Sequence, residues 1–174
     1  VQAAKNRAAK PDKFWAIIDE NSTRFAREGL AESCLQEGDV MPDFVLLNAV
    51  GEQISSANKL ASGPLIVSFY RGDWGPYCNL ELYALQKQLP KIKSLGASLV
   101  AITPDSPDNT LSTMEKNELQ FDVLSDQDNA VARSFGLVFQ LPEVVHDFYR
   151  SERVNLPGTQ GNENFELPVT GTYI

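Results

Sequence analysis

The sequence predicts an α/β protein, and three observations carry that prediction. Residues 65–70 and 97–103 are short, nearly continuous apolar runs with the composition of buried parallel strands. Apolar residues at helical spacing separate the two runs, so strand, helix and strand form a βαβ unit with a right-handed parallel crossover. The alternation of strand and helix then continues to residue 135, which is typical of an α/β domain.

Before the first of these strands, the chain has two simpler parts. Between residues 11 and 33, apolar residues at helical spacing predict one or two amphipathic helices, with Gly29 as a stop. Residues 43–48 are then expected to form a strand. Gly51 and a second short strand follow it, so the two strands should form a hairpin. We therefore expect an N-terminal helical extension over residues 1–36 and a main domain over residues 37–174.

The later elements follow from the same patterns. A helix should run from Cys78 to a cap at Gly96, and further helices should cover residues 107–117 and 128–135 on either side of a strand at 121–124. After residue 141 the pattern weakens to a short helix at 143–149, a loop at 156–162 and a strand at 170–174. Four carboxylates near strand and helix ends are expected to be cap and turn residues: Asp105, Asp108, Asp126 and Asp128.

Composition excludes several classes of function. The 174 residues carry 23 acidic and 15 basic side chains, so a net charge of −8 disfavours nucleic acid or an anionic membrane as partner. No apolar run approaches the roughly 20 residues that span a bilayer, and the first residues have no apolar core of a secretory signal. We expect a soluble, cytoplasmic protein. Two distant cysteines and one histidine give neither a disulfide framework nor a transition-metal site.

The stretch VSFYRGDWGPYCNLEL places Cys78 just beyond a strand, in the first turn of a helix. Unpaired backbone N–H groups and the helix dipole favour an anion there, which predicts a lowered thiol pKa. The alternative is a small cysteine packed in the core. Arg71, Gly72, Gly75 and Pro76 favour a functional thiolate, because a nearby cation and close backbone approach are what such a thiolate needs.

The segment YRGDWGPYCNLEL closely resembles the site FYRGxWCPYCNxEL of the peroxiredoxin-like branch of the alkyl hydroperoxide reductase and thiol-specific antioxidant (AhpC/TSA) family. The segments GDVMPDFVLLNAVG, TLSTMEKN, VLSDQDNAVARSFGLVF and LPVTGTYI also resemble the family, in the same order. The resemblance implies a three-layer α/β/α thioredoxin-like fold with N-terminal additions, in which Cys78 is the peroxidatic cysteine. It also implies a further strand and helix, which are missing after Ile174. We expect a truncated sequence, and the alternative is a sheet edge that another chain covers.

The active-site segment departs from the family pattern. Gly75 stands where the family has its first cysteine, so the local dithiol is absent. Against the wider pattern Pro-x-x-x-Thr-x-x-Cys, Arg71 and Gly75 replace the proline and the threonine. The family's arginine has no clear counterpart, since its positions fall at Asn129 or Ala130 and at Thr170. Arg71 is the substitute candidate, and a solvated turn cation is the alternative.

The other candidates each have two interpretations. Glu81 matches a family glutamate and either orders the site by hydrogen bonds or acts as a carboxylate of the first helical turn. Trp74 and Tyr77 either line an apolar peroxide pocket or pack the turn onto the sheet. Cys34 is a resolving thiol or, as we expect, a packed side chain. We expect His146 to be structural.

The resemblance implies a thiol peroxidase that reduces hydrogen peroxide or organic hydroperoxides through Cys78. The expected reductant is an external thiol of thioredoxin or glutathione type, and no organic cofactor or metal is required. Two alternatives stay open: a monothiol disulfide oxidoreductase, and a catalytically impaired redox-sensing or binding homologue, which Gly75 in place of cysteine favours. We expect no nucleic-acid or membrane partner, and a homodimer stays open.

Overall fold

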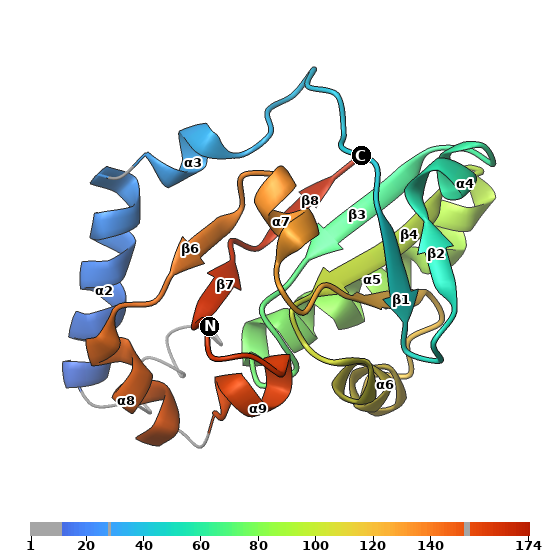
Figure 1. The fold of residues 1–174 in the computed structure, drawn as a ribbon. Helices are drawn as coiled ribbons and strands as arrows, with labels where there is room; N and C mark the ends of the chain where they lie inside the picture. Colours follow the sequence, from blue (N-terminus) through green and yellow to red (C-terminus); the bar gives the residue numbers. More distant parts are fainter. Residues whose placement is uncertain (1–11, 28, 152–153) are drawn as a thin grey trace.

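A computed structural model describes residues 12–27, 29–151 and 154–174. Its centre is a six-stranded sheet with helices on both faces (Figure 1). The strands, in chain order, are β1 (Val45–Asn48), β2 (Gln53–Ser55), β3 (Leu65–Phe69), β4 (Ser98–Thr103), β5 (Asp122–Ser125) and β8 (Gly171–Tyr173). Their order in the sheet is β2-β1-β5-β4-β3-β8, so the predicted α/β class is confirmed.

The predicted βαβ unit is present. Strands β3 and β4 pair in parallel from Leu65 opposite Ser98 to Phe69 opposite Ile102, and helix α5 (Pro76–Ser94) connects them. Strand β5 continues the parallel pairing beside β4, while β1 and β8 pair antiparallel with β5 and β3. The carboxyl ends of β3, β4 and β5 therefore meet at one edge of the sheet, where open α/β folds bind ligands.

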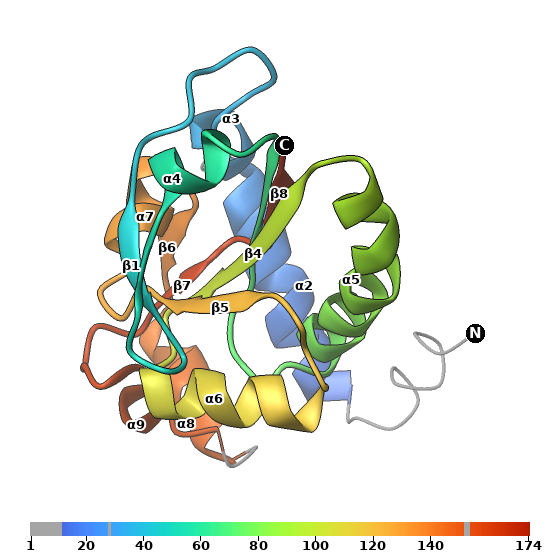
Figure 2. The same ribbon diagram turned by 90° about the vertical axis from the view of Figure 1, so that its right-hand side faces the viewer.

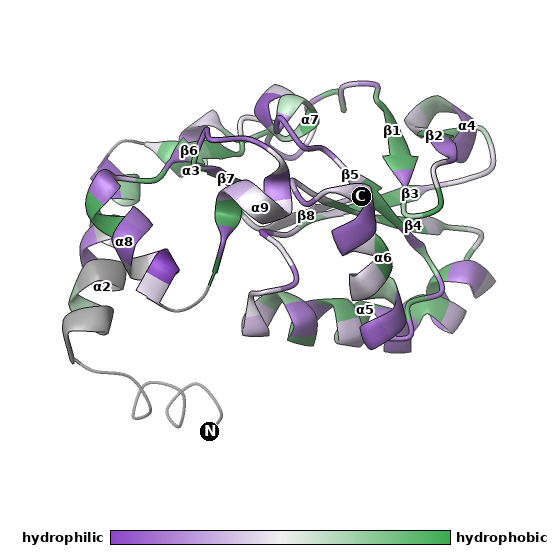
Figure 3. Cartoon of the chain, turned by 60° about the horizontal axis from the view of Figure 1, so that its bottom comes forward, coloured by the Kyte–Doolittle hydropathy of each residue, from purple (hydrophilic) through white to green (hydrophobic). Residues whose placement is uncertain are grey.

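Alternate residues of the strands pack against different helices, which gives the three layers. On one face, Leu99 and Ala101 of β4 pack with Leu82 of α5, and α6 (Pro107–Lys116) covers the same side. On the other face, Val100 and Ile102 join a cluster that includes α7 (Ala130–Ser134). Figure 2 shows α5 and α7 on opposite sides of the sheet. In Figure 3, α5 and α6 carry both hydrophilic and hydrophobic residues, as expected for helices covering a sheet.

In the described part of the chain, two helices precede the hairpin, as predicted. Helix α2 (Asp12–Arg27) and helix α3 (Leu30–Ser33) are separated by Gly29, whose φ of 65° is left-handed and suits glycine. The centre of the Phe25 ring lies 4.4 Å from the centre of the Phe139 ring. The Leu35 N–H donates to the Phe135 carbonyl at 3.0 Å. The helical segment thus packs on the α/β body. Residues 1–11 of the expected extension lie outside the described residues, and the boundary at 36 stays a prediction.

The last third of the chain contains elements that the sequence analysis missed. Strands β6 (Val138–Gln140) and β7 (Glu166–Pro168) pair antiparallel in a separate two-stranded sheet. The predicted loop at 156–162 was wrong, because it contains helix α9 (Leu156–Gln160). The Asn155 side chain accepts a hydrogen bond from the Gly158 N–H, Pro157 lies in the first turn, and Gly161 follows with φ 74°. These residues are helix start and stop signals as well as turn formers.

Two short helices complete the fold: α4 (Ser56–Leu60) and α8 (Glu143–Ser151), the second as predicted. Among the described residues, none of the helices combines the length and the apolar character needed to cross a membrane. Strand β8 lies at the edge of the sheet, and the strand and helix expected after it stay a prediction.

Candidate active site

Cys78 lies where the chain passes from β3 into helix α5. Gly75 is the N-cap of this helix, and Pro76 occupies its first position, where proline needs no N–H partner. Cys78 is therefore the third helical residue, and its side chain is only 6% exposed. It packs in the core cluster with Tyr70 and Leu82, directly beneath the turn formed by residues 71–75. The thiol is at the predicted place but is buried.

The electrostatic environment of the thiol is a balance of opposed effects. Burial is the largest effect and raises the pKa of Cys78. The backbone N–H groups of Arg71 and Gly72 and the positive charge of Arg71 lower this pKa in part, while the Glu81 charge raises it. The predicted lowering of the thiol pKa is wrong, because the cost of desolvating the thiolate exceeds the stabilisation from the amides and the cation.

Arg71 is held in place beside the thiol. It is half-buried, its Nε donates to the Pro168 carbonyl at 3.3 Å, and its guanidinium lies 5.2 Å from the centre of the Phe139 ring. These contacts with β6 and β7 argue against the alternative of a solvated turn cation. The Arg71 charge also lowers the pKa of Tyr149, although burial of that phenol is the larger effect and raises it.

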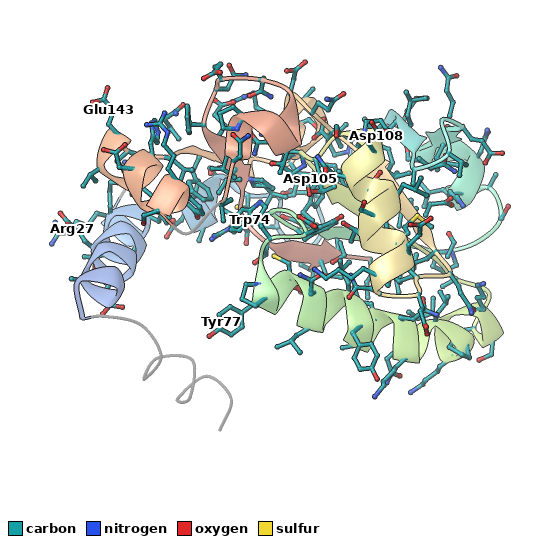
Figure 4. The ribbon with its side chains drawn as sticks, turned by 90° about the horizontal axis from the view of Figure 1, so that it is seen from below. Arg27, Trp74, Tyr77, Asp105, Asp108 and Glu143 are labelled. Carbon is teal, nitrogen blue, oxygen red and sulfur yellow. The ribbon has the colours of Figure 1, made fainter. Side chains whose placement is uncertain are left out.

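The residues around the turn divide between packing and solvent. Trp74 packs edge-on against Tyr149 of α8 with ring centres 5.2 Å apart. It is thus a packed side chain, but its cluster contains residues of β6, β7 and α8 rather than of the central sheet. Tyr77 is 52% exposed and points outward from the start of α5 (Figure 4). Glu81 is also exposed, and because α5 begins at Pro76, it lies beyond the first helical turn. The interpretation of Glu81 as a first-turn carboxylate is therefore wrong.

Gly75 is next to the thiol. A Cβ atom built on Gly75 lies 3.0 Å from the Cys78 Sγ and 3.4 Å from the Cys78 Cβ. The Gly75 φ of −83° is a conformation that any residue adopts. The family's missing cysteine therefore corresponds to a position whose side chain would face Sγ.

Asp105, which follows β4, is part of this site, although the sequence suggested only a cap or turn role. Its side chain is fully buried, and its Oδ2 accepts a hydrogen bond from the Asp73 N–H at 3.1 Å. Burial raises the pKa of Asp105 to about 7, and the nearby Asp73 charge adds to the effect. The signal that could have found it is its place after a parallel strand, at the sheet edge that Cys78 also occupies.

Tyr70 is a second residue that the sequence did not single out. It is 1% exposed, and burial raises the pKa of its phenol, with smaller contributions from the charges of Asp105 and Cys78. The Tyr70 hydroxyl, the Asp105 carboxyl and the Cys78 thiol are therefore electrostatic neighbours in one buried region.

The remaining candidates lie elsewhere. Cys34 packs against the core on the opposite face of the sheet from Cys78, and its Sγ donates to the Leu30 carbonyl at 3.2 Å. The His146 ring stacks on the Phe165 ring with centres 3.8 Å apart, and its Nε2 lies 3.0 Å from the Leu141 carbonyl oxygen. Both contacts are structural, as expected for His146. Asp126 caps α7, as expected, through the N–H groups of residues 131 and 132.

The two positions at which the family has its arginine hold no cation in this protein. Asn129 is buried in a left-handed turn before α7, with its Nδ2 donating to the Glu166 carbonyl at 3.3 Å, and Thr170 is exposed. Arg71 is thus the cation that lowers the pKa of Cys78. The catalytic roles of Cys78 and Arg71 stay predictions.

Comparison with known proteins finds relatives that are named as peroxiredoxins. Residues 38–159 match the AhpC/TSA family. The peroxiredoxin Bcp of Escherichia coli strain K12 is 30% identical over 103 residues, which cover 59% of this chain and 65% of that protein. The chloroplastic peroxiredoxin Q of Triticum aestivum is 27% identical over 135 residues, covering 78% of this chain and 62% of that protein. The chain thus spans just under two thirds of these relatives.

Solved structures agree on the fold. The peroxidoxin BcpB of Mycobacterium tuberculosis superposes with a TM-score of 0.58 at 27% identity, over 60% of this chain and 68% of that one. Peroxiredoxin Q of Xanthomonas campestris superposes with a TM-score of 0.52 at 25% identity, over 56% of this chain and 61% of that one. The predicted thioredoxin-like fold is confirmed, and the chain belongs to the AhpC/TSA family.

Proposed function

We propose that this protein is a thiol peroxidase that reduces hydrogen peroxide or organic hydroperoxides through Cys78. The observation that carries the proposal is the place of the thiol: third in helix α5, at the family's peroxidatic position, next to the amides of Arg71 and Gly72 and the Arg71 cation. These groups are positioned to stabilise the thiolate and the negative charge that develops on the peroxide. The names of the curated relatives support the same activity.

The reaction follows from the chemistry of a single thiol. The Cys78 thiolate attacks one peroxide oxygen, an S–O bond forms, and the O–O bond breaks. The leaving oxygen takes the electron pair and a proton and departs as water or alcohol. The sulfenic acid then reacts with an external thiol to give a mixed disulfide and water, and a second thiol releases reduced Cys78. We propose a reductant of thioredoxin or glutathione type in a reducing cytoplasm.

A second candidate is a catalytically impaired homologue that senses oxidants or binds a partner. The observation that favours it is the burial of Cys78, which is 6% exposed and whose pKa is raised by that burial. A raised pKa reduces the thiolate fraction near neutral pH, and the thiolate is the nucleophile.

Stopped-flow kinetics distinguish the two candidates. The Cys34→Ser variant, which leaves Cys78 as the one thiol, is mixed with hydrogen peroxide or cumene hydroperoxide, and Cys34→Ser/Cys78→Ser is the control. For a peroxidase, we expect a rate constant per thiolate about 100-fold or more above that of free cysteine, because positioned amides and a cation stabilise the transition state. A value equal to that of a free thiol of the same pKa contradicts the proposal and supports the second candidate.

A further inference from the structure

The turn that covers Cys78 is clamped at the peptide groups of Asp73. The Asp73 N–H donates to the Asp105 carboxylate at 3.1 Å. The Asp73 carbonyl accepts a hydrogen bond from the Asn79 side chain at 2.6 Å, and Asn117 in turn donates to Asn79 at 2.9 Å. One contact comes from the end of β4 and the other from α5 itself. The backbone at residue 73 is therefore fixed from both sides.

The glycine at position 72 allows the Asp105 carboxylate to approach the backbone of the turn. Its φ of 146° lies in a region that L-residues other than glycine rarely adopt. A Cβ atom built there lies 2.4 Å from the Trp74 Nε1 and 3.0 Å from the Asp105 Oδ2. The indole N–H and the carboxylate thus approach the same point over the Gly72 Cα, which leaves no room for a side chain. Trp74 and Asp105 are labelled in Figure 4.

The region beneath the turn is polar, although it is buried. Within the described part of the chain, the Trp74 Nε1, the Asp105 Oδ1 and the Tyr70 hydroxyl are buried without a hydrogen bond of good geometry. Threonine hydroxyls nearby lower the pKa of Tyr70 and of Asp105 in part. Each buried polar atom without a good hydrogen bond costs about 1–3 kcal/mol of stability. An apolar side chain at position 105 would avoid part of that cost. The contact that the carboxyl group provides in this region is the hydrogen bond from the Asp73 N–H, which an apolar side chain could not make.

We propose that Asp105 is a positioning residue for the Cys78 thiol: it fixes the 71–75 turn so that the amides of Arg71 and Gly72 stay at the sulfur. The inference rests on the proposed function, because the turn matters for chemistry only if Cys78 reacts. In this inference Asp105 acts through the turn, by the hydrogen bond that its carboxylate accepts from the Asp73 N–H. The two amides of the turn are among the main groups that lower the pKa of Cys78.

The test compares two substitutions at position 105 in the Cys34→Ser background. Asp105→Asn keeps an oxygen that can accept from the Asp73 N–H, whereas Asp105→Leu keeps the approximate volume and removes the acceptor. The thiol pKa of Cys78 is read from the ultraviolet absorbance of the thiolate during a pH titration, and the rate with hydrogen peroxide is measured in parallel. We expect Asp105→Leu to raise the pKa by about one unit and slow the reaction about tenfold. Asp105→Asn should stay close to the parent in both.

The direction of the pKa change separates positioning from charge. Removing a negative charge near a thiol lowers its pKa, whereas loss of the turn amides raises it. Asp126→Asn is the matched control: it alters a buried carboxyl that caps α7 and should leave the pKa of Cys78 unchanged. Should Asp105→Leu lose its native circular dichroism, Asp105→Ala replaces it.

Two results would overturn the inference: a Cys78 pKa in Asp105→Leu that equals or falls below that of the parent, or equal defects in the Asn and Leu variants. The titration needs no peroxide. A chain without peroxidase activity would therefore contradict the proposed function while the thiol pKa still decided the role of Asp105.

Discussion

At the scale of single residues, the site is set by what surrounds one sulfur atom. Desolvation raises the pKa of Cys78, and the amides and charge of the turn oppose it. The sequence motif located the thiol correctly because the strand, turn and helix are local in sequence. It gave the wrong pKa direction, because burial depends on α6, β4 and β5 packing over the same region, and those contacts are made by residues distant in the chain.

Gly75→Cys should create a disulfide with Cys78. The built Cβ is 3.0 Å from the Cys78 Sγ and 3.4 Å from the Cys78 Cβ, and the second distance is just below the range of about 3.5–4.5 Å between the Cβ atoms of a disulfide. A small shift of the turn suffices, and the backbone φ of Gly75 is ordinary. We expect loss of both thiols at positions 75 and 78 on mild oxidation in the Cys34→Ser background, measured by thiol titration and by mass after alkylation.

Gly75→Ser is the matched control for this disulfide. It adds a side chain of similar size and should keep one titratable thiol. If Gly75→Cys retains two free thiols after oxidation while the protein is folded, the turn does not hold residue 75 against the Cys78 sulfur.

At the scale of elements, the apolar runs of the central sheet identified β3 and β4, and they fixed the parallel pairing that brings Cys78 and Asp105 to one edge. Three-residue strands such as β6 and β7 have too few residues for a periodic pattern, so they were missed. The contact of Asp105 with Asp73 joins residues 32 apart, and it depends on the sheet rather than on either local motif. That is why the motif alone did not include Asp105.

The turn between β3 and α5 should tolerate substitution at Gly72 poorly. Gly72→Ala introduces a strained φ and places Cβ against the Trp74 indole and the Asp105 carboxylate. Gly96, at the end of α5, also has a positive φ, of 74°, but its Cβ would meet nothing within 4 Å. We therefore expect Gly72→Ala to lower the free energy of unfolding by about 3 kcal/mol and Gly96→Ala by about 1 kcal/mol.

Urea unfolding of both alanine variants measures the difference between these two positions. Equal losses would mean that the backbone conformation alone accounts for the cost. In that case the close approach of Trp74 and Asp105 to Gly72 would contribute nothing to the free energy of unfolding that the alanine variant loses.

At the scale of the whole molecule, a buried carboxyl makes stability depend on pH. The pKa of Asp105 is raised to about 7, whereas an unfolded aspartate has a pKa of about 3.9. The folded state thus binds more protons between these values, so the free energy of unfolding falls as pH rises from about 4 to about 7. Asp126, whose pKa burial also raises, acts in the same direction.

Asp105→Asn should flatten this pH dependence. The asparagine side chain does not titrate, so the loss of stability on the order of a few kcal/mol between pH 4 and pH 7 should shrink. Unfolding by urea at a series of pH values measures it, and Asp108→Asn, an exposed change in the first turn of α6, is the control. An unchanged slope in Asp105→Asn would mean that this carboxyl stays ionised in the folded protein.

The absence of a side chain at Gly75 has a kinetic consequence under the proposed function. A cysteine there would attack the oxidised sulfur at the high effective concentration of a neighbour in the same turn. With glycine in that place, both reductive steps require collision with a thiol from solution. The lifetime of oxidised Cys78 would then be set by the concentration of that thiol, so the fraction of oxidised protein would report the supply of reductant as well as the supply of peroxide.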